Sequence, residues 1–493
     1  LCTMHPESGR KSGSITAVRR FAIRCAGCGA NILNGLPAVV FVMLLAVASI
    51  PTISEARQSF VVTNGNDSGP GSLRDAIAQA ETSPFASRSI TFAPDLQLVQ
   101  LTTGSIEISA PGAYNISASF ASGLVVDPLQ SSRIFSVTDP DVELNLSGLI
   151  LRNGRTVADA PATATCASGT GHGGAICALG PLSVFGVAFV DNQTQGDGAH
   201  GGAVYAAQGI QLTNTCPASG PGCSFSGNST EGPGANGGAI YSEAELVFPT
   251  LASSVNYRFE RNRAENGTGG AIRAPAIQVE PVSGVGPRDP VSFVDNFAEL
   301  GGALAIECTA NDPDSMIQDS VFEDNSARSG GGAIRVERFC QIDIRTSRFD
   351  GNACQRGGGG AIFPEGATDI RQTVFENNRC AGPGGAIAGN TIRLEAGNIL
   401  RGNFTQGDGN HGGAVAAASL VIRDSMLAFN RTEGAAASGG AIWVLDTLDI
   451  GNSTISNNEA LATRSGGGAL FFSGASQDLD LQSSTVFQNS AER

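Results

Sequence analysis

Three of the four histidines stand at the same place in a repeated motif, immediately before Gly-Gly-Ala: His172, His200 and His411. His172 and His200 lie in consecutive repeats, so their rings could stack and hold a metal ion with Asp197, since imidazole and carboxylate groups are common metal ligands. The same position in the other eight repeats holds Asn, Thr, Leu, Gly, Pro or Ser. This variety favours a turn position that takes small or polar residues, and we assign no metal site.

Carbohydrate cleavage is the second chemistry that the residues suggest. Gly171–Gly173 is similar to a fragment of β-helical polygalacturonases, but glycoside hydrolysis needs paired carboxylates, and no two adjacent aspartates occur in the chain. A β-eliminating lyase needs a base and a cation held by carboxylates, yet Lys11 is the only lysine and no spacing singles out such a set. The turn Asn311–Asp314 could bind calcium, although a solvated loop is the simpler interpretation. The sequence therefore assigns no catalytic or cofactor-binding residue and no cofactor.

Composition and charge narrow the class of protein. The chain has 493 residues and a net charge of −15, which argues against binding to nucleic acid or to an anionic membrane surface. Glycine accounts for 65 residues, roughly twice the usual share of about 7%. An apolar content of 41% allows a large core. The glycines must therefore serve a repeated structural purpose.

The N-terminus has the layout of a secretory signal peptide. Arg19, Arg20 and Arg24 form a positively charged region, and the apolar run Leu36–Ile50 follows. That run is short for a transmembrane helix, which needs about 20 residues. Small residues at Ser54 and Ala56 predict cleavage after Ala56 and export of the mature protein; the alternative is an uncleaved signal anchor.

Two motifs alternate through residues 150–493 and define a repeat of 25 to 36 residues. The first is Gly-Gly-Ala followed by Ile, Val or Leu, with its alanines at Ala175, Ala203, Ala239, Ala271, Ala303, Ala333, Ala361, Ala386, Ala414, Ala441 and Ala469. The second is Phe-x-x-Asn, which ends at Asn192, Asn228, Asn262, Asn296, Asn325, Asn352 and Asn378. Weaker copies of it end at Asn153, Asn403, Asn430, Asn458 and Asn489. Self-similarity at this period indicates a solenoid, a propeller or an array.

The segments between the motifs favour a parallel β-helix. Short stretches such as Gln341–Arg345 alternate apolar and polar residues, which is typical of strands. About three strands per repeat fit one coil, whereas a propeller blade needs about 40–45 residues. In coils stacked about 4.8 Å apart, the phenylalanines would form an internal column and the asparagines an amide ladder. We expect about twelve coils.

Eight cysteines follow the signal peptide, and an even number in an exported protein predicts disulfides. Cys354 and Cys380 each stand two residues after a motif asparagine, so they occupy equivalent places in successive coils. Their Cα atoms would then lie within bonding range. Three further pairs are expected with less support from position: Cys308–Cys340, Cys166–Cys177 and Cys216–Cys223.

The two alternating motifs resemble the polymorphic outer membrane protein repeats of bacterial surface proteins. The segment Phe60–Ile77 is similar to the N-terminal segment of secreted right-handed β-helix proteins, and on its own residues Ser72 is a plausible helix cap before Leu73–Ala80. The resemblance implies an all-β, right-handed parallel β-helix solenoid with a short N-terminal capping helix. It also implies export and display at the cell surface, where such proteins act as autotransporter passengers and adhesins.

The expected organisation is a signal peptide over residues 1–56, a cap with the first coils over 57–148, and the repeat solenoid over 149–493. The chain stops after a half-repeat, so we expect it to be a fragment whose outer membrane association depends on a missing C-terminal segment. The sequence favours a bacterial surface or secreted protein that is adhesin-like or structural and not an enzyme. The alternative is a polysaccharide lyase or glycoside hydrolase on the same fold. The partner of the adhesin-like protein would be a cell-surface glycan or protein, and not nucleic acid. It would be bound by the lateral face and by loops 154–171, 208–224 and 274–290.

Overall fold

The computed structural model describes residues 57–120, 123–159, 165–167, 169–213, 222–248, 257–279, 290–461, 463–473 and 478–492. The chain divides into two compact units, residues 1–55 and 56–493, and the second contains all of the described residues. The predicted signal peptide lies outside them. None of the helices in the described ranges is long and apolar enough to cross a membrane.

The second unit is built from three parallel sheets. The 25-stranded sheet contains β1 (Arg57–Val62), β2 (Ser87–Phe92), β4 (Ile106–Ile108), β5 (Gly112–Ser117), β7 (Phe135–Val137), β8 (Val142–Ser147), β11 (Ile176–Ala178), β12 (Leu182–Phe185), β15 (Val204–Ala206), β16 (Ile210–Thr213), β19 (Ile240–Ser242), β20 (Leu246–Phe248), β23 (Ile272–Ala274), β24 (Ile277–Val279), β27 (Leu304–Ile306), β28 (Ser315–Gln318), β31 (Ile334–Val336), β32 (Ile342–Arg345), β35 (Ile362–Pro364), β36 (Ala367–Arg371), β39 (Ile387–Glu395), β42 (Val415–Arg423), β45 (Ile442–Gly451), β48 (Leu470–Phe472) and β49 (Asp478–Gln482). The 14-stranded sheet contains β3 (Leu98–Gln100), β6 (Leu124–Asp127), β9 (Leu149–Arg152), β13 (Ala188–Val190), β17 (Cys223–Ser226), β21 (Tyr257–Glu260), β25 (Val291–Val294), β29 (Ser320–Glu323), β33 (Arg348–Asp350), β37 (Val374–Glu376), β40 (Ile399–Arg401), β43 (Met426–Ala428), β46 (Thr454–Ser456) and β50 (Thr485–Phe487). The 12-stranded sheet contains β10 (Arg155–Thr156), β14 (Gln193–Thr194), β18 (Ser229–Thr230), β22 (Arg263–Thr268), β26 (Phe297–Leu300), β30 (Ser326–Ala327), β34 (Ala353–Cys354), β38 (Arg379–Cys380), β41 (Phe404–Thr405), β44 (Arg431–Thr432), β47 (Glu459–Ala460) and β51 (Ser490–Ala491).

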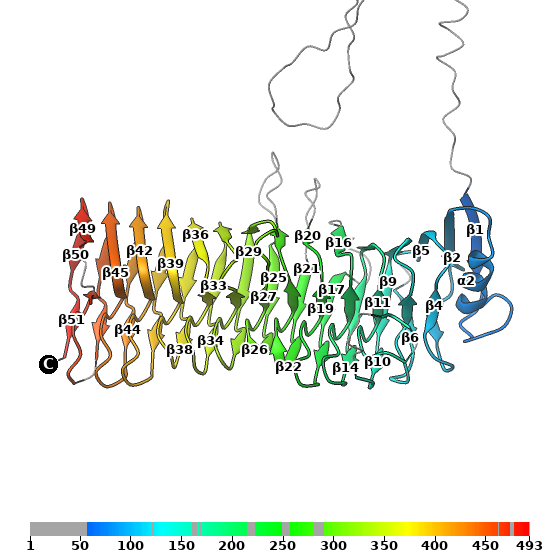
Figure 1. The fold of residues 1–493 in the computed structure, drawn as a ribbon, viewed down its shortest axis with the longest axis horizontal. Helices are drawn as coiled ribbons and strands as arrows, with labels where there is room; N and C mark the ends of the chain where they lie inside the picture. Colours follow the sequence, from blue (N-terminus) through cyan, green and yellow to red (C-terminus); the bar gives the residue numbers. More distant parts are fainter. Residues whose placement is uncertain are drawn as a thin grey trace, which may run out of the picture. The chain divides into compact units, whose positions relative to one another are not determined.

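Each coil stacks on the coil before it (Figure 1). The 25- and 14-stranded sheets begin in the first coils, and the 12-stranded sheet begins at β10. The predicted parallel β-solenoid is confirmed. The coil number is larger than expected, because the 14-stranded sheet takes one strand from each coil and so marks about fourteen coils. The estimate of about twelve came from the two motifs, and the coils of β3 and β6 carry neither of them.

The predicted internal columns are both present. The phenylalanines from Phe189 to Phe375 stack in register, with neighbouring ring centroids 4.6–4.9 Å apart. Each buried motif asparagine donates from Nδ2 to Oδ1 of the next one, as in the 2.9 Å bond from Asn352 to Asn378. Apolar burial and amide bonding thus repeat from coil to coil wherever the Phe-x-x-Asn motif occurs.

One copy of the motif differs from expectation. The left-handed residue is the one before the motif asparagine, such as Asp191 with φ 52° and Asp324 with φ 53°. Asn153 is therefore a turn residue and no ladder member: it has φ 58°, and Gly154 fills the ladder position and donates its N–H to Oδ1 of Asn192 at 2.9 Å. The sequence motif alone did not show whether Asn153 occupies the ladder position or the left-handed turn position before it.

The two glycines of the Gly-Gly-Ala motif are needed for different reasons. The first adopts a left-handed conformation, as Gly359 does with φ 68°, which glycine adopts without strain. The second glycine is not left-handed, but it has no room for a side chain. At Gly360, a Cβ atom would lie 2.0 Å from the carbonyl oxygen of Gly385 in the next coil. Coil stacking therefore excludes any side chain there.

A short helix, α2 (Leu73–Glu81), follows β1 as expected. The Ser72 side chain caps it by accepting a hydrogen bond from the N–H of Asp75 at 3.2 Å. Its buried residues Leu73, Ala76, Ile77 and Ala80 belong to the same apolar core as the inner residues of the first coils. The helix packs against β1, β2 and β4 at the N-terminal end of the solenoid.

The disulfides follow the coil register. Cys354 and Cys380 are paired neighbours in β34 and β38, and they form the predicted bridge with Cα atoms 4.6 Å apart. The predicted bridges Cys308–Cys340 and Cys166–Cys177 are also present, with Cα separations of 5.5 and 5.2 Å. Cys216 lies outside the described residues, so the fourth pairing stays a prediction.

Candidate binding groove

One outward-facing position recurs along the 25-stranded sheet, two residues after each motif alanine. We call this row of side chains the outer column. Its members are Cys177, Tyr205, Tyr241, Arg273, Ala305, Arg335, Phe363, Ala388, Ala416, Trp443 and Phe471. Strand alternation turns these side chains away from the core, while the residues on either side point inward.

Large planar groups fill much of the outer column. Tyr205 and Tyr241 stack with ring centroids 5.6 Å apart, and the guanidinium of Arg273 lies 4.7 Å from the centre of the Tyr241 ring. Farther along, Arg335 lies 4.9 Å from the centre of the Phe363 ring. These contacts cover the lateral face of the coils with stacked side chains.

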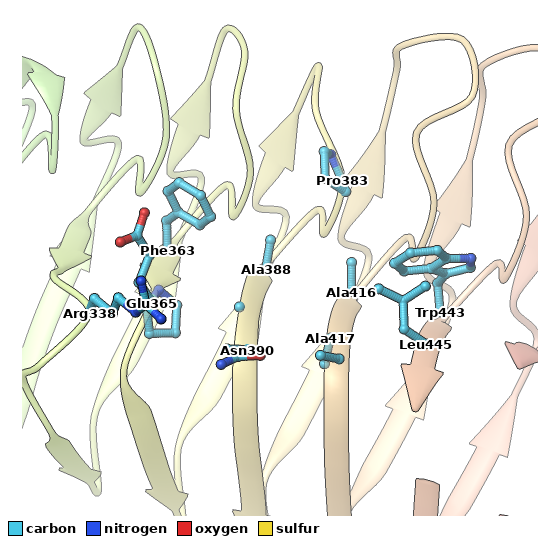
Figure 2. A pocket seen from close by; sticks show the side chains of 13 residues that line it. Arg338, Phe363, Glu365, Pro383, Ala388, Asn390, Ala416, Ala417, Trp443 and Leu445 are labelled. Carbon is cyan, nitrogen blue, oxygen red and sulfur yellow. The ribbon is translucent and has the colours of Figure 1, made fainter. Parts of the chain in front are cut away.

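The outer column is interrupted at Ala388 and Ala416, and a groove of about 500 Å³ opens there. Phe363 and Trp443 stand on opposite sides of these alanines (Figure 2). They are three coils apart, which corresponds to about 14 Å at the usual strand spacing of about 4.8 Å. The groove lining consists of Arg338, Phe363, Pro364, Glu365, Pro383, Ala388, Gly389, Asn390, Ala416, Ala417, Ala418, Trp443 and Leu445.

The groove combines an apolar, aromatic surface with a few polar groups. Arg338 and Glu365 are its only charged lining residues, and the Glu365 carboxylate pairs with Arg335 at 2.7 Å. The Asn390 side chain supplies amide donors and an acceptor near the floor (Figure 2). Aromatic walls with a small number of polar groups are typical of ligand sites. Paired carboxylates for glycoside hydrolysis are not present among these lining residues.

The floor of the groove is preformed. β39 pairs with β36 on one side and β42 on the other, and β42 pairs in turn with β45. The indole of Trp443 is supported by His411, whose ring stacks on it with a centroid distance of 5.1 Å and an interplanar angle of 17°. Neither the backbone nor the main aromatic wall needs to be ordered by a ligand.

The histidines have a structural role that the sequence did not reveal. Nδ1 of His172 accepts a hydrogen bond from the N–H of His200 at 3.2 Å, and Nδ1 of His200 accepts from the N–H of Asn236 at 3.1 Å. Nδ1 of His411 accepts from the N–H of Ser438 at 2.9 Å. The position before Gly-Gly-Ala is thus an acceptor for the next coil wherever it holds His, Asn or Ser.

The metal hypothesis gains no support from this arrangement. Stacking does bring His172 and His200 together, with centroids 5.3 Å apart, but their Nδ1 atoms already accept backbone hydrogen bonds. Asp197 is exposed, and its N–H donates to Asp159. Within the described part of the chain, no group of three or more His, Cys, Asp or Glu side chains is arranged to hold a metal ion.

Acid should weaken the fold through these histidines. Burial, with nearby positive charge, lowers the pKa of both His172 and His200 from 6.5 to about 4. The unfolded chain then binds protons first, so stability is constant above about pH 6.5 and falls as the pH drops toward 4, by about 3 kcal/mol per histidine. Urea unfolding at pH 7.5 and pH 4 measures the loss. His200→Asn, which copies Asn236 of the next coil, should reduce it, and an unchanged pH dependence would contradict this account.

The other predicted sites divide between described and undescribed residues. In the turn that contains Asn311–Asp314, Oδ2 of Asp312 accepts from the N–H and the hydroxyl of Thr309, at 2.6 and 2.9 Å, so this carboxylate is bonded within its own loop. Parts of the three long loops fall outside the described residues: 160–164 and 168, 214–221, and 280–289.

The sequence analysis missed the groove residues because alanine has no reactive or polar group that would mark it as a functional residue. Ala388 and Ala416 matter only through their place in a column whose other members are mostly large. Aligning the eleven repeats on Gly-Gly-Ala and inspecting the second residue after it would have shown the interruption between Phe363 and Trp443.

The motifs correspond to a known repeat. Residues 222–243, 319–337 and 372–390 match the Chlamydia polymorphic membrane protein repeat, and the third segment includes Pro383, Ala388 and Asn390 of the groove. No curated protein and no solved structure matches the chain. The chain is thus a parallel β-solenoid that carries polymorphic membrane protein repeats. This repeat indicates a surface-exposed or autotransporter-type β-helix protein, which fits a location at the bacterial surface.

Proposed function

We propose that the protein is an adhesin-like binding protein of the bacterial surface, in which the solenoid presents a ligand groove on its lateral face and performs no catalysis. The observation that carries this proposal is the interruption of the outer column between Phe363 and Trp443. The partner is a molecule of another cell surface, a glycan or a protein. The predicted signal peptide and the polymorphic membrane protein repeats support export to that location.

The physical state of the groove supports binding. Stacked coils hold its floor in a continuous sheet, so a ligand loses little affinity to ordering the protein. Trp is also the residue most often found among those that dominate binding energy, and Trp443 forms one wall. A net charge of −15 keeps the protein soluble and does not favour anionic partners.

Trp443→Ala tests this function. Labelled protein is incubated with a panel of cultured animal cells and bacterial cells, and binding is measured by flow cytometry. The substitution should weaken binding to the recognised cells at least roughly tenfold, as loss of a central aromatic contact does. Tyr241→Ala, a change of the same kind in the outer column away from the groove, is the control and should keep its binding. Equal binding by the two variants would rule out the groove as the attachment site.

A further inference from the structure

We propose that the ligand of the groove is a neutral oligosaccharide of a cell-surface glycan, which places its sugar rings on Phe363 and Trp443 above the alanine floor. This inference rests on the proposed binding function and names the ligand class of the same groove. A hexose ring has faces made of C–H bonds and a rim of hydroxyl groups. It therefore fits a surface that combines aromatic rings with a few hydrogen-bonding groups.

The polar groups are placed for such a ligand. Asn390 lies at the floor and Arg338 beside Glu365, on the same side of the groove as Phe363 (Figure 2). Amide, guanidinium and carboxylate groups together offer both donors and acceptors, and sugar hydroxyls act as both. An opening that spans three coils accommodates more than one ring.

Charge favours a neutral sugar over an acidic one. The lining holds one positive side chain, Arg338, and one negative side chain, Glu365, whose carboxylate pairs with Arg335 at 2.7 Å. The whole chain carries a net charge of −15, so a sulfated or uronate-rich polysaccharide is repelled at a distance. The groove therefore lacks the excess of positive charge that an acidic glycan requires.

The strand pairing disfavours an extended peptide. Peptides that join a sheet bind through free backbone N–H and C=O groups at its edge. The strands of the groove, β39 and β42, are paired with neighbours on both sides, so they offer no edge. A protein partner would have to bind by side chains alone.

The direct test uses the fluorescence of Trp443, which is the only tryptophan in the chain and so reports on the groove alone. The full-length protein is titrated with chitotetraose, cellotetraose, maltotetraose and lacto-N-tetraose. We expect at least one of these neutral tetrasaccharides to shift and saturate the emission of Trp443. Calorimetry with the same sugar should give the same dissociation constant.

A variant that fills the groove is the matched control. Ala416→Tyr inserts a side chain that the same column already carries at Tyr205 and Tyr241, so the fold should accept it. It should weaken sugar binding at least roughly tenfold, with an unchanged melting temperature. Tyr241→Ala should bind the sugar as the unmodified protein does.

Treatment of the recognised cells separates this inference from the proposed function. Periodate oxidation cleaves the vicinal diols of cell-surface glycans, and it should abolish binding of the protein. If periodate leaves binding unchanged and no tetrasaccharide alters the emission, the carbohydrate assignment is overturned. A loss of binding in Trp443→Ala in that case leaves the binding function standing with a protein partner. If Trp443→Ala binds cells as well as the unmodified protein does, both the carbohydrate assignment and the binding function of the groove are overturned.

Discussion

Replacing Asn352 by Ala is expected to lower the free energy of unfolding by about 3–6 kcal/mol, since it leaves buried polar groups without partners at about 1–3 kcal/mol each. Oδ1 of Asn352 accepts from the N–H and from Nδ2 of Asn325, both at 3.0 Å, and its Nδ2 donates to the carbonyl oxygen of Phe322 at 3.0 Å. Alanine supplies none of these partners. The ladder also lies in the middle of the solenoid, where water has no access to the freed groups.

Urea unfolding followed by circular dichroism measures this loss. Because solenoid stability is a sum over coils and their interfaces, the defect should lower the midpoint or divide the transition into two. Gln355→Ala is the matched control, since Gln355 lies in the same coil with an exposed side chain, and it should change stability by less than about 0.5 kcal/mol. Equal curves for Asn352→Ala and Gln355→Ala would mean that the ladder contributes nothing.

Replacing Arg133 by Met is expected to lower the free energy of unfolding by about 3–5 kcal/mol, because hydrogen bonds to a charged group contribute about 1.5–3 kcal/mol each. Arg133 is only 3% exposed. It donates to the carbonyl oxygens of Gly173 at 2.9 Å, Thr170 at 2.7 Å and Cys166 at 3.2 Å. It thereby attaches the segment before the first Gly-Gly-Ala motif to the coil that contains Arg133.

Burial disfavours the charged form and lowers the pKa of Arg133 to about 10. Among the described residues, no ion pair includes Arg133. Methionine keeps the volume and removes the bonds. Arg356→Met is the control, because the Arg356 side chain is 70% exposed and pairs with Glu299 at the surface, where an ion pair contributes at most about 1 kcal/mol. Differential scanning calorimetry should therefore separate the two variants, and matching melting temperatures would show that Arg133 is dispensable.

The sequence predicted those parts of the fold in which one residue type serves one purpose at every coil. Phe-x-x-Asn encodes a stacked ring and a ladder amide, and Gly-Gly-Ala encodes a tight corner, so the repeat predicted the solenoid. The pairing of Cys354 with Cys380 followed from the same register. The extra coils at the N-terminus escaped prediction because they bury Leu and Val from β3 and β6 without either motif.

The groove could not be predicted in the same way, since it arises from side chains that are small. Ala388 and Ala416 matter only because Phe363 and Trp443 stand in the same outer column. The number of residues between successive column members varies from repeat to repeat, so the column is hard to recognise in the sequence. The histidines, in contrast, have conspicuous chemistry but a structural role. Their chemistry suggested a metal, but Nδ1 of His200 and of His411 serves as a backbone acceptor, a role that only the stacked coils show.

The most direct test of the binding function is the comparison of cell binding between the unmodified protein and Ala416→Tyr. This change closes the groove by adding a side chain that two other coils carry at the same position, so it removes no existing contact. The account predicts a loss of binding of at least roughly tenfold with an unchanged melting temperature. Full binding by a folded Ala416→Tyr protein would show that the groove is not the ligand site of this protein.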